Sequence, residues 1–190
     1  MKTVLHLVLV LTLTALTAAA ALAMVYDYAQ PKIAHHKAVA LKEAISVVHP
    51  GMSSKSDTTI GGTNAIVCSG ADGVLLGYAV TAKGNGYQGL ISLIFGLTPD
   101  RTKITAIKVL EHAETPGLGA LIDSHDKFGG KFEGLDVSNG ITCIKNATEP
   151  LATLKATGKI DAITGATISS EAVAKIMNKA LDGMNGKGGS

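Results

Sequence analysis

The chain has 190 residues, which suits one domain of ordinary size with appended segments. Its formal net charge is +2, charged residues make up 17% of it, and no basic run marks a phosphate-backbone contact, which excludes nucleic acid as a partner. Its two cysteines, Cys68 and Cys143, form no CxxC motif and have no histidine at zinc-site spacing, so we expect no metal centre. We interpret them as small buried side chains, although an exported domain would permit a disulfide.

The first segment is a long apolar run. Residues 4–26 carry no formal charge, and as a helix they would measure roughly 35 Å, enough to cross a bilayer core of about 30 Å. Lys2 precedes the run and favours a cytoplasmic N-terminus, which would put the rest of the chain on the extracytoplasmic side of the cell (inner) membrane. The alternative is a secretory signal peptide cleaved after Ala21-Leu22-Ala23. Because the apolar run continues beyond Ala23, we favour a retained single-span anchor over residues 1–28.

A second helix is predicted directly after this anchor. Apolar residues recur at helical spacing over residues 31–49, with charged residues on the other face. Pro31 is typical of a helix start and Pro50-Gly51 of a stop. We therefore predict that segment 29–52 is an amphipathic connecting helix.

Residues 53–184 have the pattern of a single α+β domain. Segment 53–59 is polar and turn-like, and several short apolar runs with turn-rich connections follow it, which favours antiparallel pairing. The strand-like runs are residues 65–69, 74–82, 90–97, 103–111 and 141–145. A short helix is expected within 117–127 and the clearest helix over 168–184, while 185–190 read as a flexible tail. The pattern predicts an antiparallel sheet flanked by helices.

A glycine-rich motif lies between two of these strands. Residues 84–89, GNGYQG, match G-x-G-x-x-G, but a dinucleotide fingerprint requires a helix after it and here a second strand-like run follows. The motif is therefore interpreted as a hairpin connection. Its backbone amides could still line a ligand site.

Hydroxyl-bearing residues and a glycine precede the last predicted helix. The segment 161–167 reads DAITGAT, and a helix N-terminus has unpartnered amides and a dipole that favours a phosphate. The alternative is ordinary capping of the helix by Thr167, Ser169 or Ser170. The residues alone leave both interpretations open.

A third motif follows the fourth strand-like run. Residues 111–119, EHAETPGLG, contain a proline and two glycines, which predict a tight turn with exposed amides. Such a loop can approach a flat ring closely and rest Leu118 on its face. The alternative is a turn without a ligand.

Three stretches together resemble a known family. They are GYQGLISLIFGL at 86–97, KITAIKVLEHAETPGLGA at 103–120 and DAITGATISSEAV at 161–173. With the N-terminal apolar run they resemble, over nearly the whole chain, the G subunit of the Rnf ion-translocating oxidoreductase. That protein belongs to the wider family of FMN-binding domains shared with the C subunit of the sodium-pumping NADH:quinone reductase.

The resemblance implies a covalent flavin. In that family FMN is joined by a phosphoester to the final threonine of D-x-x-[ST]-G-A-T, which is Thr167 here. A separate flavin transferase that uses FAD and magnesium makes the bond. Its recognition sequence would comprise Asp161, Thr164, Gly165 and Ala166.

The resemblance also implies a ring-binding loop and a setting. Glu114, Thr115, Gly117 and Leu118 would lie beside the isoalloxazine. The chain would be one redox component of a translocase that couples electron flow between ferredoxin and NAD to Na⁺ or H⁺ movement, incomplete as a catalyst alone. Its partners would be the A, B, C, D and E subunits of the Rnf complex, above all D and the membrane pair A and E.

Two alternatives to this assignment are open. One is the C subunit of a sodium-pumping NADH:quinone reductase, although this chain is shorter than is usual there. The other is a non-redox exported binding protein with the same fold.

Overall fold

The computed structural model describes residues 1–186, and the chain divides into two compact units, Met1–Leu41 and a second that begins at Lys42. Of the predicted tail, residues 187–190 lie outside the described residues. One helix, α1 (Lys2–Val48), makes up the first unit and continues into the second. The helix does not begin at Pro31, as the spacing predicted, but runs through it. Pro31 lies at an exposed position, where the carbonyl that its missing N–H leaves unpaired can bind water.

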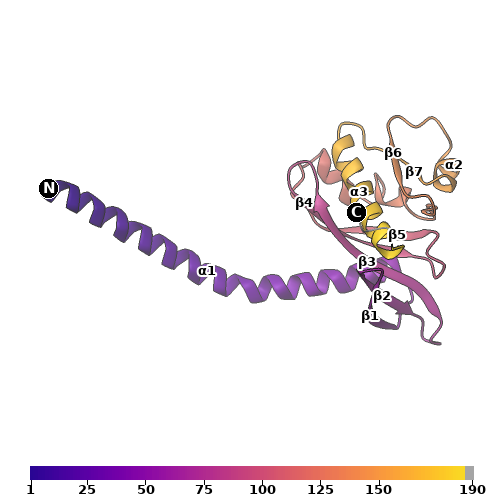
Figure 1. Ribbon diagram of the computed structural model, residues 1–190, viewed down its shortest axis with the longest axis horizontal. Helices are drawn as coiled ribbons and strands as arrows, with labels where there is room; N and C mark the ends of the chain where they lie inside the picture. Colours follow the sequence, from indigo (N-terminus) through magenta and orange to yellow (C-terminus); the bar gives the residue numbers. More distant parts are fainter. Residues whose placement is uncertain (187–190) are drawn as a thin grey trace. The chain divides into compact units, whose positions relative to one another are not determined.

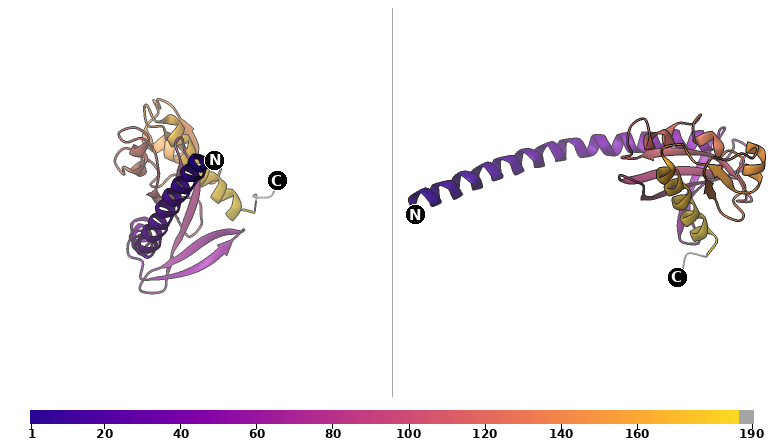
Figure 2. Two further views of the ribbon diagram at one scale, coloured as in Figure 1. Left: turned by 90° about the vertical axis from the view of Figure 1, so that its left-hand side faces the viewer. Right: turned by 90° about the horizontal axis from the view of Figure 1, so that it is seen from above.

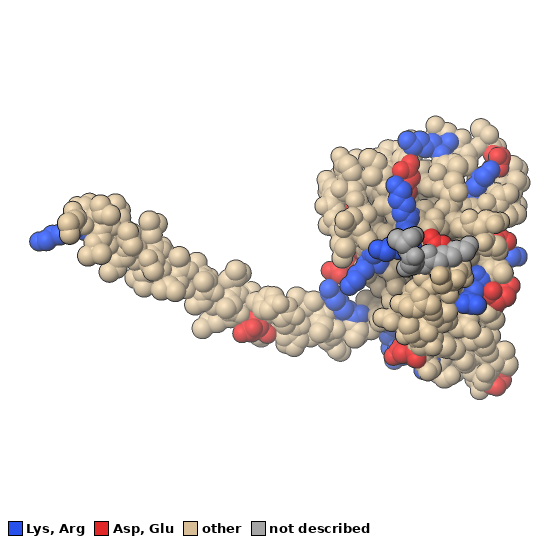
Figure 3. All heavy atoms as spheres, in the orientation of Figure 1, with Lys and Arg blue, Asp and Glu red and all other residues tan. Residues whose placement is uncertain are grey.

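The first unit has the features of a membrane span. Among the described residues, α1 is the one helix that is long and apolar enough to cross a bilayer, and none of its most apolar stretch is buried. Side chains along the run, such as Leu7, Leu11 and Leu22, are exposed. In Figure 3 the visible surface along this apolar run shows no charged side chain, in agreement with the uncharged sequence. The predicted N-terminal transmembrane helix is thus present as a candidate span.

The second unit is built on a five-stranded antiparallel sheet (Figure 1). Its strands follow chain order as a meander, which confirms the predicted α+β class with an antiparallel sheet. They are β1 (Ser54–Ile60), β2 (Thr63–Ser69), β3 (Leu75–Asn85), β4 (Leu90–Leu97) and β5 (Ile104–Glu111). Strand β1 was predicted as a turn, which is wrong. Five of its seven residues are exposed and it lies at the sheet edge, so it shows no apolar alternation.

The rest of the unit comes from the C-terminal half of the chain. Its elements are the short helices η1 (Gly119–Asp123) and η2 (Gly129–Lys131), strand β6 (Thr142–Ile144), helix α2 (Leu151–Ala156), strand β7 (Lys159–Asp161) and helix α3 (Thr167–Met184). Strands β6 and β7 form a separate parallel pair. Helix α3 begins one residue before its predicted start and packs against β3 and β2, as the views in Figures 1 and 2 show. Helix α2 and strand β7 were not predicted.

The hydrophobic core lies between the sheet and these C-terminal elements. One face of α3 contributes Val173 and Met177, which are fully buried in the same cluster as Phe95 of β4 and Phe128 and Phe132 near η2. Burying each such side chain contributes about 1.5–3 kcal/mol. The core therefore fixes the start of α3 with respect to the strand ends.

The last turn of α1 belongs to this second unit. Ala44, Ile45 and Val48 are buried there, and Thr105 Oγ1 donates a hydrogen bond to Val48 O at 2.6 Å. His49 follows and is 3% exposed; its Nε2–H donates to Tyr78 O at 3.0 Å.

His49 fits here because two glycines make room for it. A Cβ on Gly77 would lie 2.7 Å from His49 Cε1, and a Cβ on Gly96 would lie 3.0 Å from His49 Nε2. We call His49 with Gly77 and Gly96 the His49 junction.

Candidate functional site

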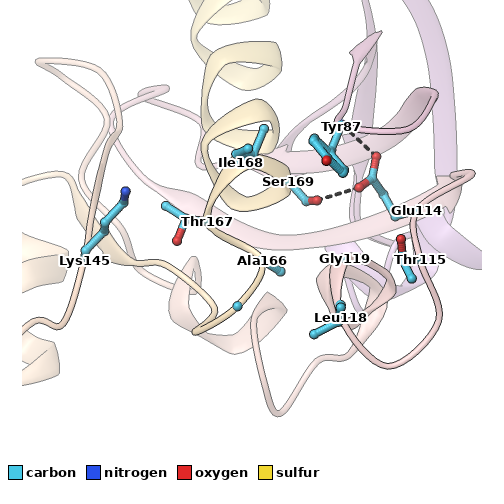
Figure 4. A pocket seen from close by; sticks show the side chains of 11 residues that line it. Tyr87, Glu114, Thr115, Leu118, Gly119, Lys145, Ala166, Thr167, Ile168 and Ser169 are labelled. Carbon is cyan, nitrogen blue, oxygen red and sulfur yellow. Dashed lines mark hydrogen bonds between the residues drawn. The ribbon is translucent and has the colours of Figure 1, made fainter.

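A cleft of about 510 Å³ opens at the N-terminus of α3 (Figure 4). Its size lies within the range of roughly 300–1,000 Å³ that is usual for small-molecule sites. Its walls come from the β3–β4 connection, the loop after β5, the loop after β6 and the first turn of α3. The lining residues are Tyr87, Glu114, Thr115, Leu118, Gly119, Lys145, Gly165, Ala166, Thr167, Ile168 and Ser169.

Two glycine turns contribute residues to the lining of the cleft. In 115–118, Leu118 N–H donates to Thr115 O at 3.2 Å, and Gly117 has a φ of +76°. In 163–166, Ala166 N–H donates to Ile163 O at 2.9 Å, and Gly165 has a φ of +83°. A positive φ at the third position is typical of a type II turn and favours glycine there. These turns explain the glycines of both motifs.

The start of α3 leaves backbone donors free. Ala166 occupies the cap position without a side-chain hydrogen bond, and Ser170 N–H is the first amide to donate along the helix, to Ala166 O at 3.0 Å. The amides of residues 167–169 have no backbone acceptor within the described part of the chain. Free amides at the N-terminus of an 18-residue helix favour an anion.

The three hydroxyl groups predicted as alternative caps have different environments. Ser170 Oγ accepts from Ile163 N–H at 3.1 Å and donates to Ala166 O, and Ser169 Oγ donates to Glu114. None of the three caps the helix, so the capping interpretation is wrong. Thr167 Oγ1 forms no hydrogen bond with any residue from 1 to 186 and lines the cleft, so it is available for chemistry.

Glu114 holds three parts of the cleft wall together. Glu114 is 4% exposed as a residue. Its Oε1 accepts from Tyr87 N–H at 2.8 Å and Gln88 N–H at 3.1 Å, and its Oε2 accepts from Ser169 Oγ at 2.5 Å. Burial raises the pKa of Glu114, but these hydrogen bonds and nearby His112 outweigh it, so the pKa lies below its ordinary value. Glu114 is therefore an ionised acceptor whose hydrogen-bonding capacity is largely used within the protein.

Two glycines leave the space that this carboxylate occupies. A Cβ on Gly86 would overlap Glu114 Oε1, and a Cβ on Gly119 would lie 2.7 Å from Oε2. We call Glu114 with Gly86, Gly119 and Ser169 the Glu114 junction. The G-x-G-x-x-G motif is a hairpin connection, as predicted, and two of its amides bind Glu114 rather than a ligand.

Apolar side chains stand exposed around the cleft. Tyr87 is 64% exposed, Ile168 57% and Leu118 50%, and all three line it. In the view of Figure 4, Lys145 and Thr167 lie at one end and Glu114 and Thr115 at the other. An apolar surface beside anion-binding donors fits a flat ring that carries a phosphate.

The predicted site residues do not all reach the cleft. Those that line it are Glu114, Thr115, Leu118, Gly165, Ala166 and Thr167. Gly117, Asp161 and Thr164 lie outside its lining, in the turns or strand that support it.

The structure adds lining residues that the sequence did not single out. Tyr87, Gly119 and Ile168 fall inside the recognised stretches and could have been chosen from them, and Ser169 was named there only as a possible cap. Lys145 falls in no motif, so nothing in the sequence marked it.

Neither cysteine takes part in the cleft. Cys68 is buried, as expected, and Cys143 is half-buried; both thiols are free. Burial raises the pKa of both, that of Cys143 to about 11 with a further contribution from Glu171, so neither is a ready nucleophile.

Comparison with known proteins gives consistent results. The family described as FMN-binding domain matches residues 86–182. The chain is 33% identical over 189 residues to the G subunit of the ion-translocating oxidoreductase complex of Methanosarcina acetivorans, covering 95% of this chain and 94% of that one. It is 37% identical over 107 residues to the G subunit of the proton-translocating ferredoxin:NAD(+) oxidoreductase complex of Clostridium ljungdahlii, covering 56% and 52%.

The fold also matches a solved structure. The C subunit of the Na(+)-translocating NADH-quinone reductase from Parabacteroides distasonis aligns with a TM-score of 0.58 and 20% identity, over 73% of this chain and 79% of that one. That identity is low enough that the likeness concerns the fold alone. The near-complete alignment with a G subunit, together with the matching domain family, shows that this chain belongs to the FMN-binding G subunits of ion-translocating oxidoreductase complexes.

Proposed function

We propose that this chain is the flavin-carrying electron-transfer component of a membrane-bound, Rnf-type ferredoxin:NAD oxidoreductase, with FMN joined by a phosphoester to Thr167. The observation that carries the proposal is the free Thr167 hydroxyl, at a helix N-terminus and in a cleft of suitable size. Thr164, the other threonine of the motif, is exposed and lies outside the cleft lining. A phosphate on Thr167 would lie next to the free amides of α3.

The attachment reaction is a phosphoryl transfer. Thr167 Oγ1 attacks the flavin-side phosphorus of FAD, and an O–P bond forms as the P–O bond of the pyrophosphate breaks. AMP leaves with the bonding electron pair, and the hydroxyl proton is released. A magnesium-dependent flavin transferase would bind the motif, including Asp161, Thr164, Gly165 and Ala166, and catalyse this step.

The other end of the cleft would hold the ring. Glu114, Thr115, Gly117 and Leu118 are proposed to lie beside the isoalloxazine, with Tyr87 as an exposed apolar neighbour. FMN supplies the redox chemistry, because it accepts and releases one or two electrons. The protein's task is to position it: the Glu114 junction fixes the wall, and the apolar side chains exclude water from one face.

Helix α1 supports a location in a membrane. We propose that residues 1–28 anchor the chain in the cell (inner) membrane with the N-terminus cytoplasmic, and that the FMN-binding domain (53–184) lies on the extracytoplasmic side. A covalent bond has a clear purpose there, since lost FMN would not be replaced. The other proteins of the complex, above all the D subunit and the A and E pair, are the proposed electron-transfer partners.

The test is intact mass after co-expression with the transferase. The wild-type chain should gain the mass of FMN less one water, and fragmentation should place the gain on Thr167. Thr167→Ala should lose the gain completely, because it removes the only attacking oxygen. Thr148→Ala, which removes an exposed threonine hydroxyl outside the cleft, should keep it. A flavin adduct on Thr167→Ala, or on Thr164 of the wild type, would refute the assignment.

A further inference from the structure

Lys145 is the only positively charged side chain among the residues that line the cleft. It follows β6, and Figure 4 shows its amine at the end where Thr167 lies. Within residues 1–186 its amine has no ion pair or hydrogen bond. A lone ammonium group beside three free amides is suited to one anion.

The loop that carries Lys145 is held in place. Asn146, the next residue, has a φ of +53°, a conformation that Asn tolerates better than most residues. Ala147 N–H then donates to Asp161 Oδ1 at 3.1 Å. The register Ile144↔Asp161 in the parallel β6–β7 pair brings this carboxylate beside the loop. Asp161 therefore holds the backbone two residues beyond Lys145.

Asp161 is itself held in place by Lys131. Lys131 Nζ donates to Asp161 O at 2.8 Å and lies 3.7 Å from Asp161 Oδ2. The carboxylate thus faces a backbone amide and a lysine and does not line the cleft. The first position of the DAITGAT segment has a role within this chain, whatever role it has toward the transferase.

We infer that Lys145 is a positioning residue for the phosphate on Thr167, and that Asp161 holds the Lys145 loop in the arrangement this requires. The inference rests on the proposed attachment to Thr167. A phosphodiester carries one negative charge, and Lys145 supplies a matching charge where the α3 amides supply only dipoles. Glu114 does not compete for Lys145, because its oxygens are occupied by other donors.

The experiment compares the full chain with and without FMN, in detergent, for each variant. Co-expression with and without the transferase gives the two forms, and the quantity measured is the rise in Tm that FMN confers. Taking the difference within one variant cancels any structural damage that the substitution causes by itself. The ³¹P resonance of the folded FMN form reports the phosphate directly.

In the wild type we expect FMN to raise Tm. Lys145→Glu should lose at least half of that rise and shift the ³¹P resonance, because it places a like charge beside the phosphate. Lys145→Arg should retain both values. Lys127→Glu, with the same charge change at an exposed position outside the cleft, should behave as the wild type.

Several results would overturn the inference. If the wild type carries FMN but Lys145→Glu keeps the whole Tm rise and the ³¹P position, Lys145 does not position the phosphate. If FMN confers no rise in the wild type, the ³¹P resonance decides alone, and an unchanged resonance in Lys145→Glu overturns the inference. A wild-type chain that carries no FMN would instead refute the proposed function, and this inference with it.

The role of Asp161 is tested without flavin. Asp161→Ala should speed amide hydrogen exchange at Ala147 at least tenfold in the unmodified chain, since the acceptor is removed. Asp161→Asn keeps an oxygen acceptor and should preserve most of the protection. Equal exchange rates at Ala147 in wild type and Asp161→Ala would show that Asp161 does not hold the loop.

Discussion

The His49 junction and the Glu114 junction both bury a polar side chain beside two glycines, but one of these side chains is neutral and the other is ionised. In each, a buried polar side chain lies between two glycines, and a Cβ on either glycine would lie 3.0 Å or less from it. His49 holds the last turn of α1 on the sheet through one hydrogen bond to Tyr78. Glu114 accepts three hydrogen bonds and ties the β3–β4 connection to the first turn of α3.

The difference concerns charge. Desolvation lowers the pKa of His49, although its bond to Tyr78 opposes this, and it is neutral at pH 7. Glu114 keeps its charge because donors compensate for its burial. A neutral group suffices for anchoring α1. Glu114 lies in the cleft wall, where its oxygens, largely occupied by donors of the protein, hold the shape of the site.

Gly77 at the His49 junction should give the largest effect on substitution. Its φ is +147°, and an added Cβ would overlap Leu97 O and approach His49 Cε1. Gly77→Ala should lower the free energy of unfolding by about 4 kcal/mol, because overpacking and backbone strain each cost roughly 1–3 kcal/mol. Chemical denaturation of the full chain in detergent measures it.

The matched control is Gly73→Ala. Gly73 also has a positive φ, +76°, but nothing lies within 4 Å of its added Cβ. Its cost should be strain alone, about 1 kcal/mol. If the two variants lose equal stability, the fit of the His49 ring between Gly77 and Gly96 is not the cause.

Substitution of Glu114 should come next. Glu114→Leu leaves Tyr87 N–H, Gln88 N–H and Ser169 Oγ without their acceptor, at about 3 kcal/mol in total once water at the cleft relieves part of the cost. Glu114→Gln should lose less than half as much, since its carbonyl can accept from both amides and its NH₂ can donate to Ser169. A Gln variant as unstable as the Leu variant would mean that the charge itself is required.

The sequence predicted the elements whose pattern is strong. The β3–β4 hairpin shows apolar runs around a glycine-rich turn, and α3 shows helical periodicity over 18 residues. Strands β1 and β7 were not predicted, because β1 is polar and exposed and β7 has only three residues. Local signals of this size are weaker than the tertiary contacts that form such strands.

The site was predictable only in part. The two turns could be predicted, because residues that favour turns, such as Pro116, Gly117 and Gly165, lie in the turn segments themselves. The Glu114 contacts were not, because they join residues 27 and 55 positions apart in the chain. The assignment of Thr167 came from resemblance to the family, and the hydrogen bonds of Ser169 and Ser170 now separate it from its neighbours.

The smallest effect is the pH dependence of the His49 junction. Because the folded pKa of His49 is lowered, the unfolded chain binds more protons below about pH 6.5. The contribution of His49 to stability is therefore complete above that pH and declines as the pH falls toward the folded value. His49→Gln should flatten the fall in unfolding free energy between about pH 6.5 and 5.

His125 serves as the comparison, because its pKa is raised, mainly by its hydrogen bond to Glu133. Its contribution to stability is present below about pH 6.5 and is lost as the pH rises through the raised value. His125→Gln should consequently leave the fall between about pH 6.5 and 5 nearly unchanged and alter the curve above about pH 6.5, so the two variants should deviate from the wild type in different pH ranges. A His49→Gln curve that runs parallel to the wild-type curve between about pH 6.5 and 5 would place the acid sensitivity outside the His49 junction.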